Sequence, residues 1–125
     1  MRNLLQCIGN TPLLRLEKMP DAGAAEVFVK WEGANPTGSM KDRMALAMVE
    51  GAEQRGQLKP GGTVIDYTGG STGSSLAMVC AAKGYKAHFV SSDAFAEEKL
   101  QTMRTFGATL DLVPSVNRKI TAELI

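Results

Sequence analysis

The feature that most restricts how this chain can fold is a regular alternation of helical and strand patterns between Arg43 and Val113. Apolar residues at helical spacing predict helices over 43–56, 74–83 and 96–106, and β-forming runs predict strands over 63–67, 86–91 and 109–113. Alternating helices and strands are typical of an α/β fold with a mostly parallel sheet and right-handed crossovers. We therefore expect a three-layer α/β unit with helices flanking the sheet.

The three predicted helices differ in which residues they should bury. The middle helix is so apolar that it must be well covered, and Gly84 is placed to end it. Helical spacing predicts inward faces made of Met44, Ala47, Met48 and Ala52 in the first helix and of Leu100, Met103 and Phe106 in the third.

The first 40 residues carry a different pattern. Two short apolar runs, Leu13 to Leu16 and Val27 to Trp31, are rich in β-forming residues. The segment between them contains Pro20 and Gly23, which favour a loop. The sequence therefore predicts an N-terminal β-hairpin ahead of the α/β part.

Composition excludes several classes of function. A chain of 125 residues that is 44% hydrophobic and 22% charged suits one globular domain with a moderate core. A net charge of +1 gives no reason to expect a nucleic-acid or membrane partner, and no apolar run is long enough for a membrane span. Two cysteines without a secretory leader favour the cytoplasm, and no His/Cys/Asp cluster has metal-ligand spacing.

The segment Asn35-Pro36-Thr37-Gly38-Ser39-Met40-Lys41-Asp42-Arg43 holds the strongest candidate for chemistry. Pro36 and Gly38 favour a loop, and Ser39 is placed to cap the helix that follows. Lys41 then lies in the first helical turn, where the helix dipole disfavours a cation by a few tenths of a kcal/mol, up to ~1. That favours the neutral amine, which is the form that attacks carbonyl groups, although Asp42 and Arg43 can be read as helix-end charges alone.

These nine residues resemble the internal-aldimine lysine motif of the fold-type II pyridoxal-phosphate (PLP) enzymes, the cysteine synthase and cystathionine β-synthase group. Ile8-Gly9-Asn10-Thr11-Pro12-Leu13 is similar to the N-terminal signature of that family. Thr68-Gly69-Gly70-Ser71-Thr72-Gly73 resembles its substrate-carboxylate loop. The three motifs stand in the family's order and at its spacing, and the resemblance covers essentially the whole chain.

The resemblance implies a function and a set of site residues. Lys41 would form the Schiff base with PLP and return the proton at the substrate Cα, and Ser71 would lie at the cofactor. The loop residues Thr68, Gly69, Gly70, Ser71 and Thr72 would hold the α-carboxylate of a small amino-acid substrate. The expected reaction is a cysteine synthase-like β-replacement or β-elimination, such as making cysteine from an activated serine.

Two positions of the loop depart from the family's commonest pattern. Gly69 stands where a serine is usual, and Ser71 stands where an asparagine usually contacts the phenolic oxygen of the cofactor. Serine is shorter than asparagine. Substrate preference and cofactor tuning are therefore the two properties in which we expect this chain to differ from the family.

The resemblance also implies a division of the chain. Residues 1–40 would belong with the family's large domain, and residues 41–125 would build its small domain. The chain is shorter than family members, and it has no candidate for their phosphate loop or for the hydroxyl that meets the pyridine nitrogen. We therefore expect weak or no PLP binding by the isolated chain. Unpaired apolar strands should favour a homodimer or other self-association.

Two other hypotheses remain open from the sequence. One is a non-catalytic truncated paralogue that acts as an oligomerising subdomain. The other is a nucleotide-binding α/β module, because Asp93 lies 20 residues after Gly73, where a Rossmann fold places its ribose carboxylate. The loop spacing is G-G-x-x-G rather than G-x-G-x-x-G, and no Walker sequence follows it.

Overall fold

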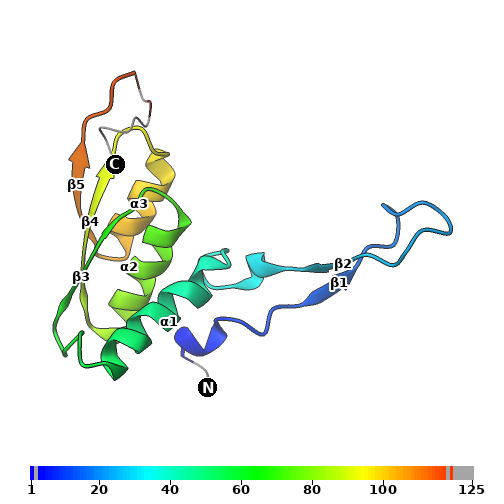
Figure 1. Cartoon of the computed structure of the whole chain (residues 1–125), viewed down its shortest axis with the longest axis horizontal. Helices are drawn as coiled ribbons and strands as arrows, with labels where there is room; N and C mark the ends of the chain where they lie inside the picture. The colour runs from blue at the N-terminus through cyan, green and yellow to red at the C-terminus, as the bar shows by residue number, and fades with distance from the viewer. Residues whose placement is uncertain (2, 118, 120–125) are drawn as a thin grey trace.

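The computed structural model describes residues 1, 3–117 and 119, and it shows an α/β unit from which a β-hairpin arm extends (Figure 1). Residues 118 and 120–125, the end of the predicted 41–125 unit, lie outside the described residues. The elements in chain order are η1 (Leu5–Cys7), β1 (Leu13–Arg15), β2 (Phe28–Lys30), η2 (Glu32–Ala34), α1 (Lys41–Gln54), β3 (Thr63–Tyr67), α2 (Ser71–Lys83), β4 (Lys86–Ser92), α3 (Glu97–Thr105) and β5 (Thr109–Val113).

The sheet of the α/β unit confirms the prediction of parallel strands. β3, β4 and β5 are ordered as in the chain, and both neighbouring pairs are parallel. Tyr67 is paired with Val90, and Ser92 is paired with Val113, so the carboxyl ends of β3 and β4 lie side by side. This edge is where open α/β sheets bind their ligands.

The predicted α/β fold with helices flanking a parallel sheet is confirmed, and within the described chain α2 and α3 lie on one face of that sheet. α2 packs on β4 and also contacts α1 and α3, while α3 packs on β5. Helices that touch one another cannot lie on opposite faces of one sheet. Because the strand order follows the chain, both crossovers advance in the same direction and place α2 and α3 on the same face. The opposite face is open, and Ile65 on it is 72% exposed.

The buried face of α1 differs from the prediction by about one residue. Ala45 and Val49 are buried against the core, together with Asp42. Ala47 and Met48, predicted to point inward, are exposed. The prediction was wrong because the buried face of α1 begins with the carboxylate of Asp42. A periodicity analysis counts a charged residue as exposed.

α2 begins at Ser71, three residues before the predicted start. Every residue from Gly73 to Cys80 is buried, which confirms that this apolar helix is well covered. Gly73 is helical, and a Cβ atom there would lie 2.5 Å from both Met103 Cε and Thr68 Cγ2. A glycine is therefore needed at this position for close packing and not to form a turn. Gly84 ends the helix in the left-handed region (φ 79°), as predicted.

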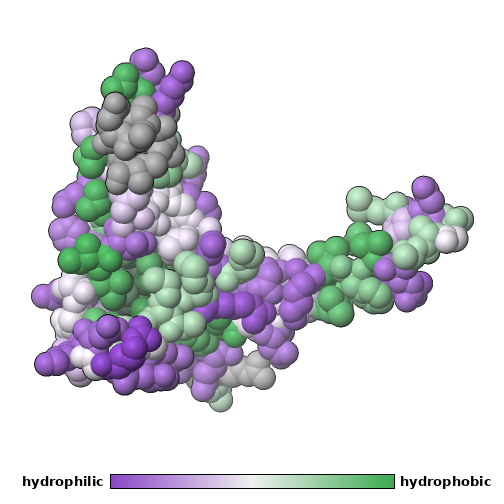
Figure 2. Space-filling view, viewed as in Figure 1, coloured by the Kyte–Doolittle hydropathy of each residue, from purple (hydrophilic) through white to green (hydrophobic). Residues whose placement is uncertain are grey.

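The N-terminal hairpin is confirmed, and it forms the arm in Figure 1. β1 and β2 are antiparallel, with Leu14 opposite Val29. Figure 2 shows a hydrophobic surface on this arm, away from the helices. The large apolar side chains exposed along the hairpin are Leu13, Leu14, Val27, Phe28, Val29 and Trp31. Within the described residues, no helix has the length and apolar character needed to cross a bilayer.

Candidate functional site

Lys41 is the first residue of α1 and follows the Asn35–Met40 loop. Met40 rather than Ser39 is the N-cap residue, but the Ser39 hydroxyl accepts a hydrogen bond from the Lys41 backbone N–H at 3.1 Å. The Lys41 side chain is half-buried, and its amine has no hydrogen-bond or ion-pair partner among residues 1, 3–117 and 119. An amine that is not paired with a carboxylate is available to react.

Asp42 joins the lysine loop to α2. Its carboxylate is fully buried and accepts hydrogen bonds from the Thr37 backbone N–H (2.8 Å), the Thr37 hydroxyl and the Ser75 hydroxyl (2.6 Å). A buried carboxylate requires such donors, because losing water around a charge is costly. The bond to Ser75 fixes the first turn of α1 beside the second turn of α2. Asp42 is therefore a structural link and not only a helix-end charge.

The predicted substrate loop lies at the carboxyl end of β3 and opens α2. Thr68 is buried, and its backbone N–H donates to Val90 O at 3.0 Å, which extends the β3–β4 pairing by one residue. Gly69 and Gly70 make the turn, and Ser71 and Thr72 are the half-buried first residues of α2. The N–H groups of a first helical turn lack intrahelical partners, so they attract anions such as a carboxylate.

The packing of α1 on α2 brings the two predicted halves of the site together. The Asp42–Ser75 bond places Lys41 at the start of α1 beside the helix that Ser71 begins. The Ser74 hydroxyl, in the first turns of α2, is buried without a hydrogen-bond partner among the described residues. The start of α1, with Lys41, and the start of α2, with its hydroxyls and helix N–H groups, are thus held side by side by the Asp42–Ser75 bond.

A second network holds the N-terminal signature against the lysine loop, and sequence reasoning missed its charged members. Arg43 donates from Nε to Glu32 Oε2 (2.8 Å) and from Nη2 to Thr11 Oγ1 (3.1 Å), and Thr11 Oγ1 donates to Glu32 Oε1 (2.6 Å). Asn35 is buried; it accepts from the Gly9 N–H (2.8 Å) and donates to Glu32. The hydrogen bonds from Arg43 and Thr11 lower the pKa of Glu32 to about 2. The only sequence signal was that Thr11, Asn35 and Arg43 lie inside two of the three motifs, whereas Glu32 lies outside all of them.

The remaining polar candidates do not gather into a second site within the described chain. His88 forms a hydrogen bond with Asp111 at 2.7 Å on the open face of the sheet, away from α1 and α2. Burial raises the pKa of the Cys80 thiol to about 11, so it is a poor nucleophile. The Asp93 carboxylate accepts from the Ser115 N–H at 2.7 Å. No three His, Cys, Asp or Glu side chains in this part of the chain are grouped to hold a metal.

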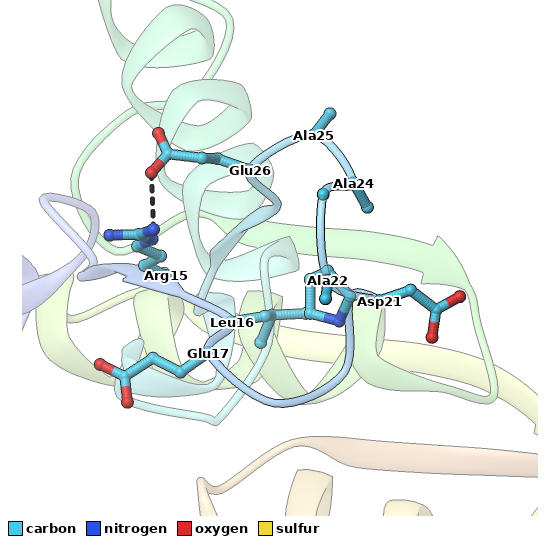
Figure 3. A pocket seen from close by; sticks show the side chains of 10 residues that line it. Arg15, Leu16, Glu17, Asp21, Ala22, Ala24, Ala25 and Glu26 are labelled. Carbon is cyan, nitrogen blue, oxygen red and sulfur yellow. Dashed lines mark ion pairs between the residues drawn. The ribbon is translucent and has the colours of Figure 1, made fainter.

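A hollow of about 400 Å³ lies at the far end of the hairpin arm, where Arg15 and Glu26 form an ion pair at 2.7 Å (Figure 3). Both side chains of the pair are more than half exposed. The hollow is formed by the β1–β2 connection and contains none of the predicted site residues. It therefore contributes nothing to the site at α1 and α2.

Comparison with known proteins agrees with the geometry. The family model described as pyridoxal-phosphate-dependent enzyme matches residues 4–124. This chain belongs to that family. Cysteine synthase of Staphylococcus aureus is 49% identical over 112 residues, and cysteine synthase B of Escherichia coli is 48% identical over 113. Each alignment covers 90% of this chain but only 36% and 37% of the relative, so the chain spans about a third of their length.

Solved structures of related enzymes also match this chain. O-ureido-L-serine synthase matches 91% of this chain with a TM-score of 0.86 and 43% identity. A hydrogen sulfide-producing enzyme of Fusobacterium nucleatum matches with the same TM-score and 40% identity. This chain covers 36% and 37% of those chains. The fold-type II architecture expected from the motifs is thereby confirmed, whereas the nucleotide-binding and non-catalytic hypotheses receive no support.

The residues at α1 and α2 fit a PLP site in their chemistry. PLP needs an amine for covalent attachment and polar groups around its ring and the bound substrate. The Lys41 amine is unpaired within the described chain, and Ser71 and Thr72 offer hydroxyls at a helix N-terminus. The resemblance predicts Lys41 as the attachment residue and Ser71 as a residue at the cofactor, and both lie in this part of the fold.

Proposed function

We propose that this chain provides the cofactor lysine and the substrate-carboxylate loop of a cysteine synthase-like enzyme that carries out β-replacement or β-elimination on a small amino acid. The observation that carries the proposal is the Asp42–Ser75 bond, which sets the start of α1, with Lys41, beside the start of α2. The cysteine synthases similar to this chain support the reaction type. The substrate class is further supported by a similar solved structure, a lysine-to-alanine mutant of O-ureido-L-serine synthase bound to O-ureido-L-serine.

Each residue of the site has a chemical role in this proposal. The Lys41 amine holds the cofactor covalently and later returns a proton to the substrate Cα. Thr68, Ser71 and Thr72 hydroxyls and the N–H groups around Gly69 and Gly70 hold the substrate carboxylate. When bound, PLP supplies an electron sink for the negative charge that develops at Cα.

The proposal also covers the motion of the domains and the cellular compartment of the protein. Residues 41–125 act as the small domain that closes on the substrate, while residues 1–40 belong with a large domain. Two free cysteines, one exposed, are consistent with a reducing cytoplasm. For the 125 residues alone we propose weak or no PLP binding, because they contain no second glycine- and threonine-rich loop for the cofactor phosphate.

The test is a chimera that joins this chain to the remaining part of the S. aureus cysteine synthase. The chimera should bind PLP and show the visible absorbance of a covalently attached cofactor. Lys41→Ala should remove that absorbance and leave the far-ultraviolet circular dichroism unchanged. Lys99→Ala, at an exposed position of α3, is the matched control and should keep the absorbance. A Lys41→Ala chimera that still attaches the cofactor covalently would contradict the role of Lys41.

A further inference from the structure

The loop after β4 lies against the predicted substrate loop. β4 pairs with β3 in parallel, so the connection 93–96 and the loop 68–70 leave the sheet at the same edge. Phe95, in the first of these loops, is half-buried. Its ring meets the Tyr67 ring edge-on, with centroids 6.5 Å apart and an interplanar angle of 62°. An aromatic pair of this kind holds both rings in place.

The ring of Phe95 occupies the space that a side chain at Gly69 would need. A Cβ atom on Gly69 would lie 2.0 Å from Phe95 Cδ2 and 2.1 Å from Cγ. Because Cγ itself is so close, turning the ring about its own axis would not remove the clash. Gly69 and Phe95 are therefore mutually dependent: the glycine makes room for the ring, and the ring covers one side of the glycine backbone.

We propose that Phe95 is a positioning residue for the substrate loop, holding the Gly69–Gly70 backbone in the shape that receives the substrate carboxylate. This inference rests on the proposed function, since it assigns the ligand of that loop. Glycine has the most conformational freedom of any residue, so two adjacent glycines need an external support to keep one shape. A hydroxyl is absent at position 69, and the ring presents an apolar edge in its place. The carboxylate must then be held by backbone N–H groups and by the hydroxyls of Thr68, Ser71 and Thr72.

The first test uses the 125-residue chain and nuclear magnetic resonance. Wild-type Gly69 α-protons should show ring-current shifts, and its amide order parameter should be that of rigid backbone, about 0.85. Phe95→Ala should remove the shifts and lower the order parameters of Gly69 and Gly70 toward about 0.6. Phe95→Leu should keep most of the order, because a branched side chain still covers the glycine. Phe106→Ala, a matched truncation at the other end of α3, should leave the loop unchanged. Unchanged Gly69 order in Phe95→Ala would overturn the proposal.

The second test is a double-mutant cycle at the two positions. Gly69→Ser alone should lower Tm by roughly 5 °C or more, because the hydroxymethyl group meets the ring. In the Phe95→Ala background the same serine should cost almost nothing, since the space is then free. A serine that is equally damaging in both backgrounds would show that the ring is not what excludes it, and would overturn the pairing.

The effect of Phe95 on substrate binding is tested in the chimera, with O-acetyl-L-serine as the probe. Phe95→Ala should raise KM about tenfold with little change in kcat, because the ring acts on carboxylate binding and not on proton transfer. Phe106→Ala should change neither. An unchanged KM in Phe95→Ala would overturn the positioning role. A wild-type chimera that binds PLP but does not act on the probe would instead contradict the proposed function, and the Gly69 order parameters would still decide for or against Phe95.

Discussion

At the scale of single residues, Glu32 is the acceptor at which the N-terminal signature and the lysine loop meet. Arg43, Thr11 and Asn35 all donate hydrogen bonds to its carboxylate, and they come from three separate segments. These donors favour the ionised form, which is why the pKa of Glu32 falls from 4.5 to about 2. One side chain thus connects the N-terminal signature, η2 and α1.

The lowered pKa predicts how stability depends on pH. A carboxyl group with a depressed folded-state pKa contributes stability that is fully present above about 4.5 and is lost as the pH falls toward 2. Glu32→Gln should therefore be less stable at neutral pH and should show a flatter decline of the urea midpoint between pH 4.5 and 2 than wild type. Glu26→Gln, which removes the exposed ion pair with Arg15, is the control and should keep the wild-type slope. An equal slope in Glu32→Gln would show that other groups govern the acid transition.

At the scale of elements, the contact between α1 and α2 organises the site. Small and branched residues, Ala45 and Val49, let the helices approach, and the core cluster joins them to α2. At one end the Asp42–Ser75 bond sets their register, and at the other Lys83 pairs with Glu53 at 2.8 Å. Two polar links at opposite ends of one apolar contact fix how far one helix can slide along the other.

Removing the buried link should be costly. Asp42→Ala leaves two hydroxyl groups and the Thr37 N–H without their acceptor in a buried place, so the free energy of unfolding should fall by roughly 2–4 kcal/mol. Ser75→Ala removes one of these bonds and should cost about 1 kcal/mol. Gln54→Ala, exposed at the end of α1, is the control and should change stability by less than about 0.5 kcal/mol. Urea unfolding of the three variants measures this, and an Asp42→Ala protein as stable as wild type would contradict the link.

At the scale of the whole molecule, two apolar surfaces are exposed. One is the hairpin arm, where both strands are exposed along their length. The other is the open face of the sheet, with Ile65 72% and Tyr67 36% exposed. Apolar strands with free edges pair with other chains unless something covers them. The alignment covers only 36% of the S. aureus relative, which leaves ample sequence in that protein to cover such surfaces.

We accordingly predict that the 125-residue protein associates with itself. Sedimentation velocity at micromolar concentration should show a dimer or larger species. Val29→Lys, which places a charge in the centre of the hairpin, should shift the distribution toward monomer. Gln101→Lys adds the same charge on exposed α3 and should have no such effect. A wild-type protein that sediments as a monomer would refute the prediction that these surfaces drive association.

The sequence by itself determined the order and type of the elements, the hairpin and the positions of the three motifs. Periodicity, turn residues and motif spacing are local properties, and β3 and β5 occur at the residues that periodicity predicted. It did not determine which face of the sheet α2 and α3 cover, which follows from strand order, or the true buried face of α1, where a carboxylate is buried. Asp42 and Ser75 are 33 residues apart in the chain, and Arg43 and Glu32 are 11 apart. Only the tertiary structure shows that these residues interact. The free energy of burying a charged residue depends on the hydrogen-bond donors that folding places around it.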